Sequence, residues 1–449
     1  MSPEIVSIIA LAVIFAIATF LPINMGALAF VAAFLVGTLS VGLSTDDIIA
    51  GFPAELVLTL IGVTYLFAIA QNNGTVDLLV RGAVRLVGGH VAAIPWIMFF
   101  VTGLLTGIGA LSPAAVAIIA PIALTFAARH GISPLLMGMM VIHGAQGGGF
   151  SPISVYGVTV NTIVEDEGLP SSPLAVFLGA LLFNLAIAVV LFFVLGGRKL
   201  LGRKVEVEAL AHSEHAQGTV VRGHGAAPGP AVGGDAADEA DERTGPDVPQ
   251  PVRLEQVLTL IGLVVVAVLA LAFDLDIGFV SITVAVVLAL FSARQHKGAV
   301  TQISWSTILL IAGVLTFVFV LEEAGTIDYV GDAVIGLGVP LLIALLLCYI
   351  GGVVSAFASS TAIIGVAILL AVPFLSAGDI GAIGVVVALS VASTIVDVSP
   401  FSTNGALVLA NAQDIDRDRF YKQILAYSAI VVAIGPLLAW LVFVVPGWL

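Results

Sequence analysis

Long apolar runs alternate with short polar segments along most of the chain. Ten runs approach the length of a membrane-spanning helix, which needs about 20 apolar residues. They cover residues 5–21, 24–43, 54–71, 133–164, 174–195, 254–273, 277–293, 303–321, 380–410 and 424–446. Two further apolar stretches, 91–128 and 339–376, are each long enough to enter a membrane and return. The pattern predicts an all-α polytopic membrane protein.

One segment interrupts this pattern and divides the chain. Residues 198–252 are rich in Gly, Ala, Pro, Asp and Glu and have no apolar periodicity, which is typical of a disordered tether. The expected domains are therefore a first transmembrane unit at 1–197, a linker at 198–252 and a second transmembrane unit at 253–449.

The two units repeat short motifs in the same order. Residues 62–63 and 74–77 resemble residues found 251 positions later, and Ser151–Gly157 resembles Ser399–Gly405, 248 positions later. Five crossings in each unit is an odd number, so the second copy must be inverted relative to the first. The sequence thus predicts two inverted repeats of about five transmembrane helices.

The placement of charge agrees with this topology. If the amino terminus lies outside, all 15 Lys and Arg fall on one side, while the opposite loops carry only acidic residues, such as Asp46, Asp47 and Glu165–Glu167. By the positive-inside rule, the basic side is cytoplasmic. We expect a multi-pass protein of the cell (inner or cytoplasmic) membrane with both termini outside and residues 198–252 in the cytoplasm.

The tips of the two long apolar stretches are small and mildly polar. Residues 107–113 and 355–361 hold no charge, which suits burial at mid-membrane, where irregular backbone survives only against protein or a wet cavity. We expect each repeat to contain one re-entrant hairpin.

Composition narrows the class further. The chain is 60% hydrophobic and 10% charged, with a mean hydropathy of +1.17, as expected of a protein that faces lipid. The single cysteine, Cys348, allows no disulfide framework, and no metal-binding spacing or basic nucleic-acid patch is present. The first apolar run lacks a cleavage site and is read as a retained helix.

Two of the long runs contain helix breakers near their middle. These are Gly147–Pro152 inside 133–164 and Asp397–Pro400 inside 380–410. Paired broken helices in inverted repeats point to the substrate site of a transporter. Helix amino termini there favour carboxylates, whereas unwound carbonyls favour a cation.

Hydroxyl and amide side chains gather at the tips and breaks. The residues expected to bind substrate are Ser112, Ser151, Ser154, Ser360, Thr361, Ser402, Thr403 and Asn404. Those expected to hold a coupling cation are Asp397, Ser359, Ser399 and Gly149. Individually, such hydroxyls often only bond their own helix, so the prediction depends on their clustering.

Three further polar residues lie within the predicted membrane core. Asp397 either holds a cation or a proton or caps the re-forming helix, and His143 is either a satisfied interior histidine or a proton carrier. Gln146 lies beside the first break. Because no Lys or Arg lies in the predicted core, an anion there must be held by dipoles, hydroxyls and an accompanying cation.

Several segments of the first unit carry a family resemblance. Residues 22–30, 51–53, 64–71, 142–146 and 148–154 resemble the malonate/dicarboxylate carrier family (MatC-like). The second unit resembles the broader ion-transporter superfamily, which includes the divalent anion/sodium symporters, more loosely. In those symporters a Ser-Asn-Thr triplet at each tip touches sodium and substrate. Ser359–Thr361 is close to that triplet, whereas the first tip keeps only Ser112.

The resemblance implies an elevator-type carrier and a homodimer. The leading hypothesis is an ion-coupled symporter for a small dicarboxylate such as malonate or a C4-dicarboxylate, with no cofactor beyond possible Na⁺ as coupling ion. The alternatives are a cation/proton antiporter on the same fold and an intramembrane hydrolase with Ser151 as nucleophile and His143 as base. Because the tips and breaks are duplicated, an enzyme is not expected.

Overall fold

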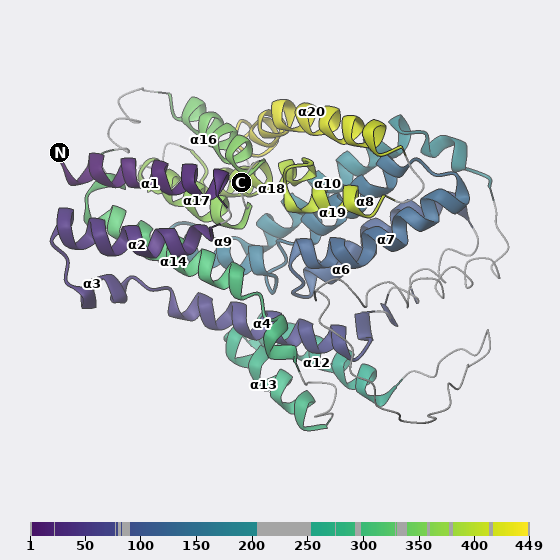
Figure 1. The fold of residues 1–449 in the computed structure, drawn as a ribbon, viewed down its shortest axis with the longest axis horizontal. Coiled ribbons are helices and arrows are strands. Elements are labelled where there is room, and N and C mark those ends of the chain that lie inside the picture. Colours follow the sequence, from purple (N-terminus) through teal and green to yellow (C-terminus); the bar gives the residue numbers. More distant parts are fainter. Residues whose placement is uncertain are drawn as a thin grey trace, which may run out of the picture.

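The computed structural model is built from helices packed against one another (Figure 1). It describes residues 2–21, 23–76, 78–79, 82, 90–203, 253–273, 275–291, 298–327, 329, 339–356, 360–376, 380–412 and 416–447. Nearly all of the predicted linker, as well as Asp77, Asp328 and Ser359, lies outside these residues.

The helices follow the predicted apolar runs closely. The first unit contains α1 (Pro3–Phe20), α2 (Met25–Val36), α3 (Thr45–Ala50), α4 (Ala54–Asn72), α6 (Ile94–Gly107), α7 (Ser112–His130), α8 (Pro134–Gly148), α9 (Val155–Asp166) and α10 (Pro173–Val194). The second contains α12 (Leu254–Phe273), α13 (Ile277–Phe291), α14 (Trp305–Glu323), α16 (Pro340–Ser355), α17 (Ser360–Ser376), α18 (Ala382–Ile395), α19 (Thr403–Ala410) and α20 (Arg417–Phe443).

Helix α20 begins earlier than the apolar pattern predicts. The run was expected from residue 424, but the helix starts at Arg417 because Asp416 caps it, accepting a bond from the Arg419 N–H at 3.1 Å. Hydropathy alone does not report this polar first turn.

Length and composition identify a polytopic membrane protein. Among the described residues, six stretches are long and apolar enough to cross a membrane: Ala54–Asn72, Ser112–His130, Pro173–Val194, Trp305–Glu323, Ala382–Ala410 and Arg417–Phe443. Several other apolar helices are shorter; α6, with 14 residues, is about 21 Å long. A typical hydrocarbon core is about 30 Å thick.

Glycines let helices of the two units approach closely. A Cβ atom on Gly26 of α2 would lie 2.0 Å from the Leu309 carbonyl oxygen, and one on Gly313 of α14 would lie 2.0 Å from the Gly26 carbonyl oxygen. In α4, a Cβ on Gly62 would lie 2.5 Å from the Gly278 carbonyl oxygen of α13. Small residues at such crossings are typical of helix packing in membranes. Figure 1 shows α2 beside α14 and α4 beside α13.

Buried hydrogen bonds join the ends of these helices. The Ser7 hydroxyl in α1 lies 2.6 Å from that of Thr326, just after α14. The Asn73 side-chain amide, just after α4, donates to the Thr259 hydroxyl of α12 at 2.6 Å. The start of α1 therefore lies at the end of α14, and the end of α4 lies at the start of α12.

Candidate functional site

The first predicted break is a real interruption between two helices. Helix α8 ends at Gly148 and α9 begins at Val155, with Ser154 as its N-cap. The Ser154 hydroxyl bonds to the carbonyl oxygens of Gly149 and, at 2.7 Å, of Ser151. Gly157 is required because a Cβ there would lie 1.9 Å from the Ser151 carbonyl oxygen. The side chain of Ser154 thus holds the turn between α8 and α9 in place.

The second break has the same construction 248 residues later. The Ser402 hydroxyl donates to the carbonyl oxygens of Asp397 at 2.6 Å and Ser399 at 2.7 Å. A Cβ on Gly405 would lie 2.0 Å from the Ser399 carbonyl oxygen. Each break leaves the first-turn N–H groups of a new helix facing the interruption, where an anion is stabilised.

The first hairpin tip contacts the second break. Ser112 begins α7, and its Oγ accepts a hydrogen bond from Asn404 Nδ2 at 2.9 Å. Both side chains are buried, Asn404 completely. The Asn404 Oδ1 atom has no partner among the described residues. An unpartnered buried polar atom is costly, which is expected where a ligand belongs.

The second hairpin tip contacts the same break. Ser360, at the start of α17, lies beside the Asp397 carboxylate, and Asp397 is only 7% exposed. Behind it, the Ser355 hydroxyl of α16 donates to Ser360 Oγ at 2.9 Å. Both tips therefore converge on residues 397–404.

The remaining site residues predicted from the sequence differ in burial. Ser151 and Ser399 are buried at their breaks, and Ser399 Oγ accepts a bond from the Phe401 N–H at 3.2 Å. Thr403 is exposed. Ser359 and the side chain of Thr361 lie outside what the structure describes.

The first break lacks the carboxylate and the amide of the second. Gly149 occupies the position that corresponds to Asp397, and Tyr156 the position that corresponds to Asn404. The Tyr156 ring packs against Phe150, with centroids 5.5 Å apart, and a Cβ on Gly149 would lie 3.1 Å from a Tyr156 ring carbon. An aromatic cluster thus covers the first break.

His143 belongs to a buried network on the far side of α8. Asn184 donates from Nδ2 to the Ala180 carbonyl at 2.9 Å, which leaves its Oδ1 to accept from His143 Nδ1 at 2.8 Å. Nε2 of His143 then accepts a hydrogen bond from the Tyr427 hydroxyl at 2.6 Å. Both ring nitrogens are occupied by residues other than Ser151, as expected of a satisfied interior histidine.

Gln146 links the two units. Its Nε2 donates to the carbonyl oxygen of Thr394 at 2.8 Å, and Thr394 is 248 positions further along the chain. The Gln146 Oε1 atom has no partner among the described residues. The bond ties the end of α8 to the end of α18.

The sequence reasoning missed several members of this region. Ser355, at the end of α16, bonds Ser360 of the second tip, and Asn184 and Tyr427 complete the His143 network. Only Ser355 had a visible signal, since it falls in the mildly polar tip 355–361. In the described part of the chain, no group of three or more His, Cys, Asp or Glu side chains could hold a metal ion.

A solved structure shares the fold of this chain. The chain matches the crystal structure of the Alcanivorax borkumensis YdaH transporter with a TM-score of 0.57 over 98% of both chains, at 14% sequence identity. The two proteins share a fold. No curated relative matches the chain. At this identity the likeness shows the fold.

The family match is confined to the first third. Residues 1–149 match the family model described as the dicarboxylate carrier protein MatC N-terminus. This confirms the resemblance predicted for that part of the chain. The matched family model is described as a carrier and the matched structure as a transporter, and neither is described as an enzyme.

Proposed function

We propose that the protein is a secondary active symporter that moves a small dicarboxylate, such as malonate or a C4-dicarboxylate, together with a cation. The observation that carries this proposal is the convergence of both hairpin tips on the second break, through Ser112 with Asn404 and Ser360 with Asp397. A carrier site reached from two hairpins can be closed from either side, which alternating access requires.

The duplicated geometry supports an inverted-repeat architecture. The two breaks share their N-cap bonds at a constant offset of 248 residues. Helices at the other end cross between the units, α2 with α14 and α13 with α4. Helix α6 has 14 residues and α16 has 16, so each is shorter than a typical hydrocarbon core, which supports a re-entrant hairpin in each unit. Helix α7 is itself long enough to cross.

The chemistry of the site favours an anion that travels with a cation. The first-turn N–H groups of α9 and α19 supply positive potential, yet the described site residues include no Lys or Arg. A dianion would be strongly disfavoured in such a core unless positive charge accompanied it. Asp397 would repel the substrate, so it belongs to the site of the coupling ion, Na⁺ or H⁺.

The family likeness supports the choice of substrate class. The matched family is a dicarboxylate carrier, and the same likeness is the ground for expecting an elevator motion and a homodimer in the cytoplasmic membrane. A cation/proton antiporter remains the alternative. Antiporters on this fold usually place more carboxylates in the core, whereas Asp397 is the one carboxylate described at the breaks.

Uptake of labelled malonate by purified protein in liposomes tests the proposal. We expect accumulation when an inward gradient of H⁺ or Na⁺ is imposed, and exchange when the vesicles are preloaded with malonate. Cation flux that proceeds without any dicarboxylate would favour the antiporter. Absence of both malonate and C4-dicarboxylate exchange would refute the proposed substrate class.

The topology has its own test. Contacts between Ser7 and Thr326, and between Asn73 and Thr259, support the expected grouping of helix ends on opposite sides. Position 230 lies in the linker, so a Pro230→Cys variant in intact cells should not react with a membrane-impermeant thiol reagent. Reaction at that position would show that the linker lies outside the cell, opposite to the expected orientation.

A further inference from the structure

An apolar groove runs between α10 and α20. It has a volume of about 740 Å³, and its walls are formed by residues 175–191 of α10 and 427–443 of α20. Both helices pack against α18, and Ile395, the last residue of α18, also lines the groove. Among the described residues that line it, Tyr427 alone has a polar side-chain atom. The groove therefore offers apolar surface along almost its whole length.

The groove lies where lipid chains are expected. Helices α10 and α20 are both long and apolar enough to cross a membrane, and wall residues such as Leu182, Val190 and Ile434 are exposed. At 1.5 Å per residue, each wall is about 24 Å long, which exceeds the thickness of one leaflet of the hydrocarbon core, about 15 Å. An acyl chain that enters from one leaflet thus fits along the groove.

One end of the groove carries positive charge on the α10 side. Phe193 lies two residues after Leu191, the last wall residue of α10, and its ring is 48% exposed. The guanidinium carbon of Arg198, in the short 3₁₀ helix Gly197–Leu200, lies 5.1 Å from the centroid of that ring. The attraction between a guanidinium group and an aromatic face holds Arg198 there. A cation is thus positioned where the wall of α10 ends.

The first turns of α20 bring further positive charge to the same end. Lys422 lies about 8 Å along the helix axis before Tyr427, the last wall residue of α20 at this end. The basic residues here are Arg198, Lys199, Arg417, Arg419 and Lys422, and the acidic residues are Asp416 and Asp418. All of them are exposed, and Asp416 serves as the N-cap of α20. Positive charge therefore prevails where the groove ends.

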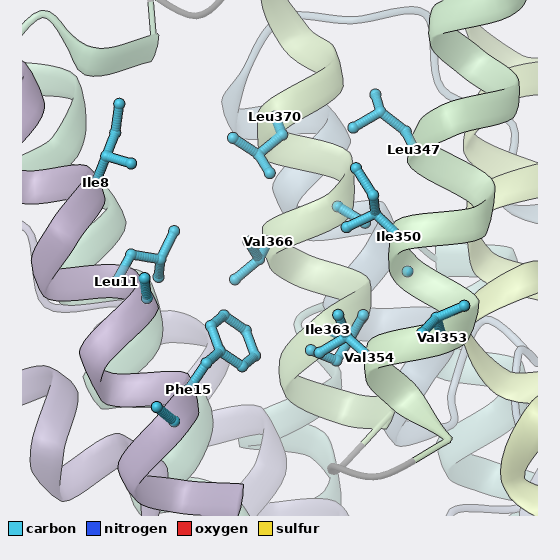
Figure 2. Close-up of a pocket in the computed structure, with 14 residues that line it drawn as sticks. Ile8, Leu11, Phe15, Leu347, Ile350, Val353, Val354, Ile363, Val366 and Leu370 are labelled. Carbon is cyan, nitrogen blue, oxygen red and sulfur yellow. The ribbon is translucent and has the colours of Figure 1, made fainter.

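A second apolar groove shows that such charge is not a general feature of grooves on this protein. It has a volume of about 580 Å³ and lies between α1 on one side and α16 and α17 on the other (Figure 2). None of these three helices contains Lys or Arg. The charged residue nearest to its lining on α1 is Glu4, one turn before Ile8. Only the α10–α20 groove combines an apolar channel with basic side chains among the described residues.

We propose that the α10–α20 groove binds an anionic phospholipid, with one acyl chain along its apolar walls and the phosphate group at Arg198 and the basic first turns of α20. Arg side chains bind phosphate oxygens through paired hydrogen bonds, and basic pockets between membrane helices bind anionic lipid headgroups. The basic end is the one expected to face the cytoplasm, so the lipid comes from that leaflet. This site goes beyond the proposed transport function and does not depend on the transported substrate.

The lining of the groove connects a bound lipid to the second break. Ile395 lies directly before the turn Val396–Val398, and a Cβ on Gly435 of α20 would lie 3.1 Å from its side chain. Tyr427 bonds His143 at 2.6 Å. An acyl chain in the groove would therefore cover the packing that joins α20 to α18 and α8. A ligand that binds only the folded state raises its stability, so unfolding reports occupancy.

The test measures lipid binding to purified full-length protein in a neutral detergent. Thermal unfolding is followed while dioleoylphosphatidylglycerol, which is anionic, or dioleoylphosphatidylcholine, which is zwitterionic, is titrated. Arg198→Gln removes the charge at the end of the groove, and Ala186→Trp fills the groove from an exposed wall position. The matched controls are Arg253→Gln, an exposed arginine before α12, and Ala12→Trp, at an exposed position in the groove of Figure 2.

We expect wild type to bind the anionic lipid about tenfold or more tightly than the zwitterionic one, the scale of one hydrogen bond to a charged group. Arg198→Gln should remove most of this preference, and Ala186→Trp should weaken the binding of both lipids. Both controls should behave as wild type. Added inorganic phosphate should not displace the lipid, because it cannot fill the apolar groove.

Four outcomes would overturn the proposal. Equal binding of the two lipids by wild type would show only non-specific lipid contact. An equal loss of preference in Arg253→Gln would indicate general attraction to a basic surface. Binding unchanged in both Arg198→Gln and Ala186→Trp would place the lipid elsewhere, and displacement by inorganic phosphate would assign the basic end to a free anion.

Discussion

The two broken helices have the same backbone and different chemistry. In both, one serine caps the re-forming helix and bonds two carbonyl oxygens of the interruption, and a glycine three residues later leaves room for the fold. The first break is covered by Tyr156 and Phe150, whereas the second presents Asp397 and Asn404 to the hairpin tips.

The difference separates what the fold needs from what transport needs. Backbone geometry at a break depends on the cap and the glycine, so both copies keep these residues. Nothing in that geometry requires a carboxylate or an amide, and the first copy does without them. The polar contacts of both tips are therefore concentrated in the second break, and we expect substitutions there to change transport while matched substitutions in the first change mainly stability.

The largest effect is expected from substituting the glycine that both breaks share. In Gly157→Ala and Gly405→Ala, the new Cβ would lie 1.9 and 2.0 Å from a backbone oxygen. Each should destabilise the protein by more than about 3 kcal/mol. Recovery of monodisperse protein in detergent measures this. Gly82→Ala, with nothing within 4 Å of its Cβ, is the control. If one variant folds normally and the other does not, the breaks are not equivalent.

Asp397→Asn should produce the next largest effect, on coupling. The variant keeps the shape of the side chain but loses the charge that holds the coupling ion, so ion-driven accumulation of malonate should largely disappear. Exchange between loaded liposomes should persist. A lost response to a pH gradient would indicate proton coupling, and a lost response to sodium would indicate sodium coupling.

Asp416→Asn, at the N-cap of α20, is the matched control for that experiment. If Asp397→Asn concentrates malonate as steeply as wild type, Asp397 is only a helix cap.

A smaller effect is expected from the tip contact. Asn404→Ala or Ser112→Ala removes a bond worth about 0.5–1.5 kcal/mol, or about 1.5–3 if the partner is charged. Apparent malonate affinity should fall from several-fold to around a hundredfold. Because the two residues bond each other, the double variant should lose less than the sum. Thr316→Ala, whose hydroxyl bonds only its own helix, should change little; equal losses at both places would indicate general destabilisation.

Removing the N-cap serine of either break should have a similar effect on stability. Ser154→Ala and Ser402→Ala each remove a cap, which costs about 1 kcal/mol. The thermal unfolding temperatures of the two purified variants in detergent should fall by similar amounts. A much larger fall for Ser402→Ala would show that the second break is also weaker as a structure.

The smallest effect is expected from the linker. A deletion within 210–248 should leave malonate transport largely intact, because that sequence has little apolar surface to bury. Loss of transport by a correctly inserted deletion variant would show that the linker does more than connect the two units.

The sequence predicts the helices and the breaks well because their signals are local. An apolar run reports a span, and Gly147–Pro152 or Asp397–Pro400 reports an interruption. The start of α20 was missed because a polar helical turn has no hydropathy signal. Partners in space were not predictable in the same way. Asn404 and Ser112 are far apart in sequence, and only the packing of α7 against α19 brings them together.

The close crossing of α2 and α14 also constrains biosynthesis. The absence of a side chain at Gly26 makes room for α14, a helix that the ribosome makes only after most of the chain. Until then α2 and α4 lack the helices that they pack against, α14 and α13, so the first unit cannot complete its packing before the second is made. Such non-local closure is intrinsically slow. Residues 1–197 therefore lack the packing partners of α2 and α4 until the second unit has been made.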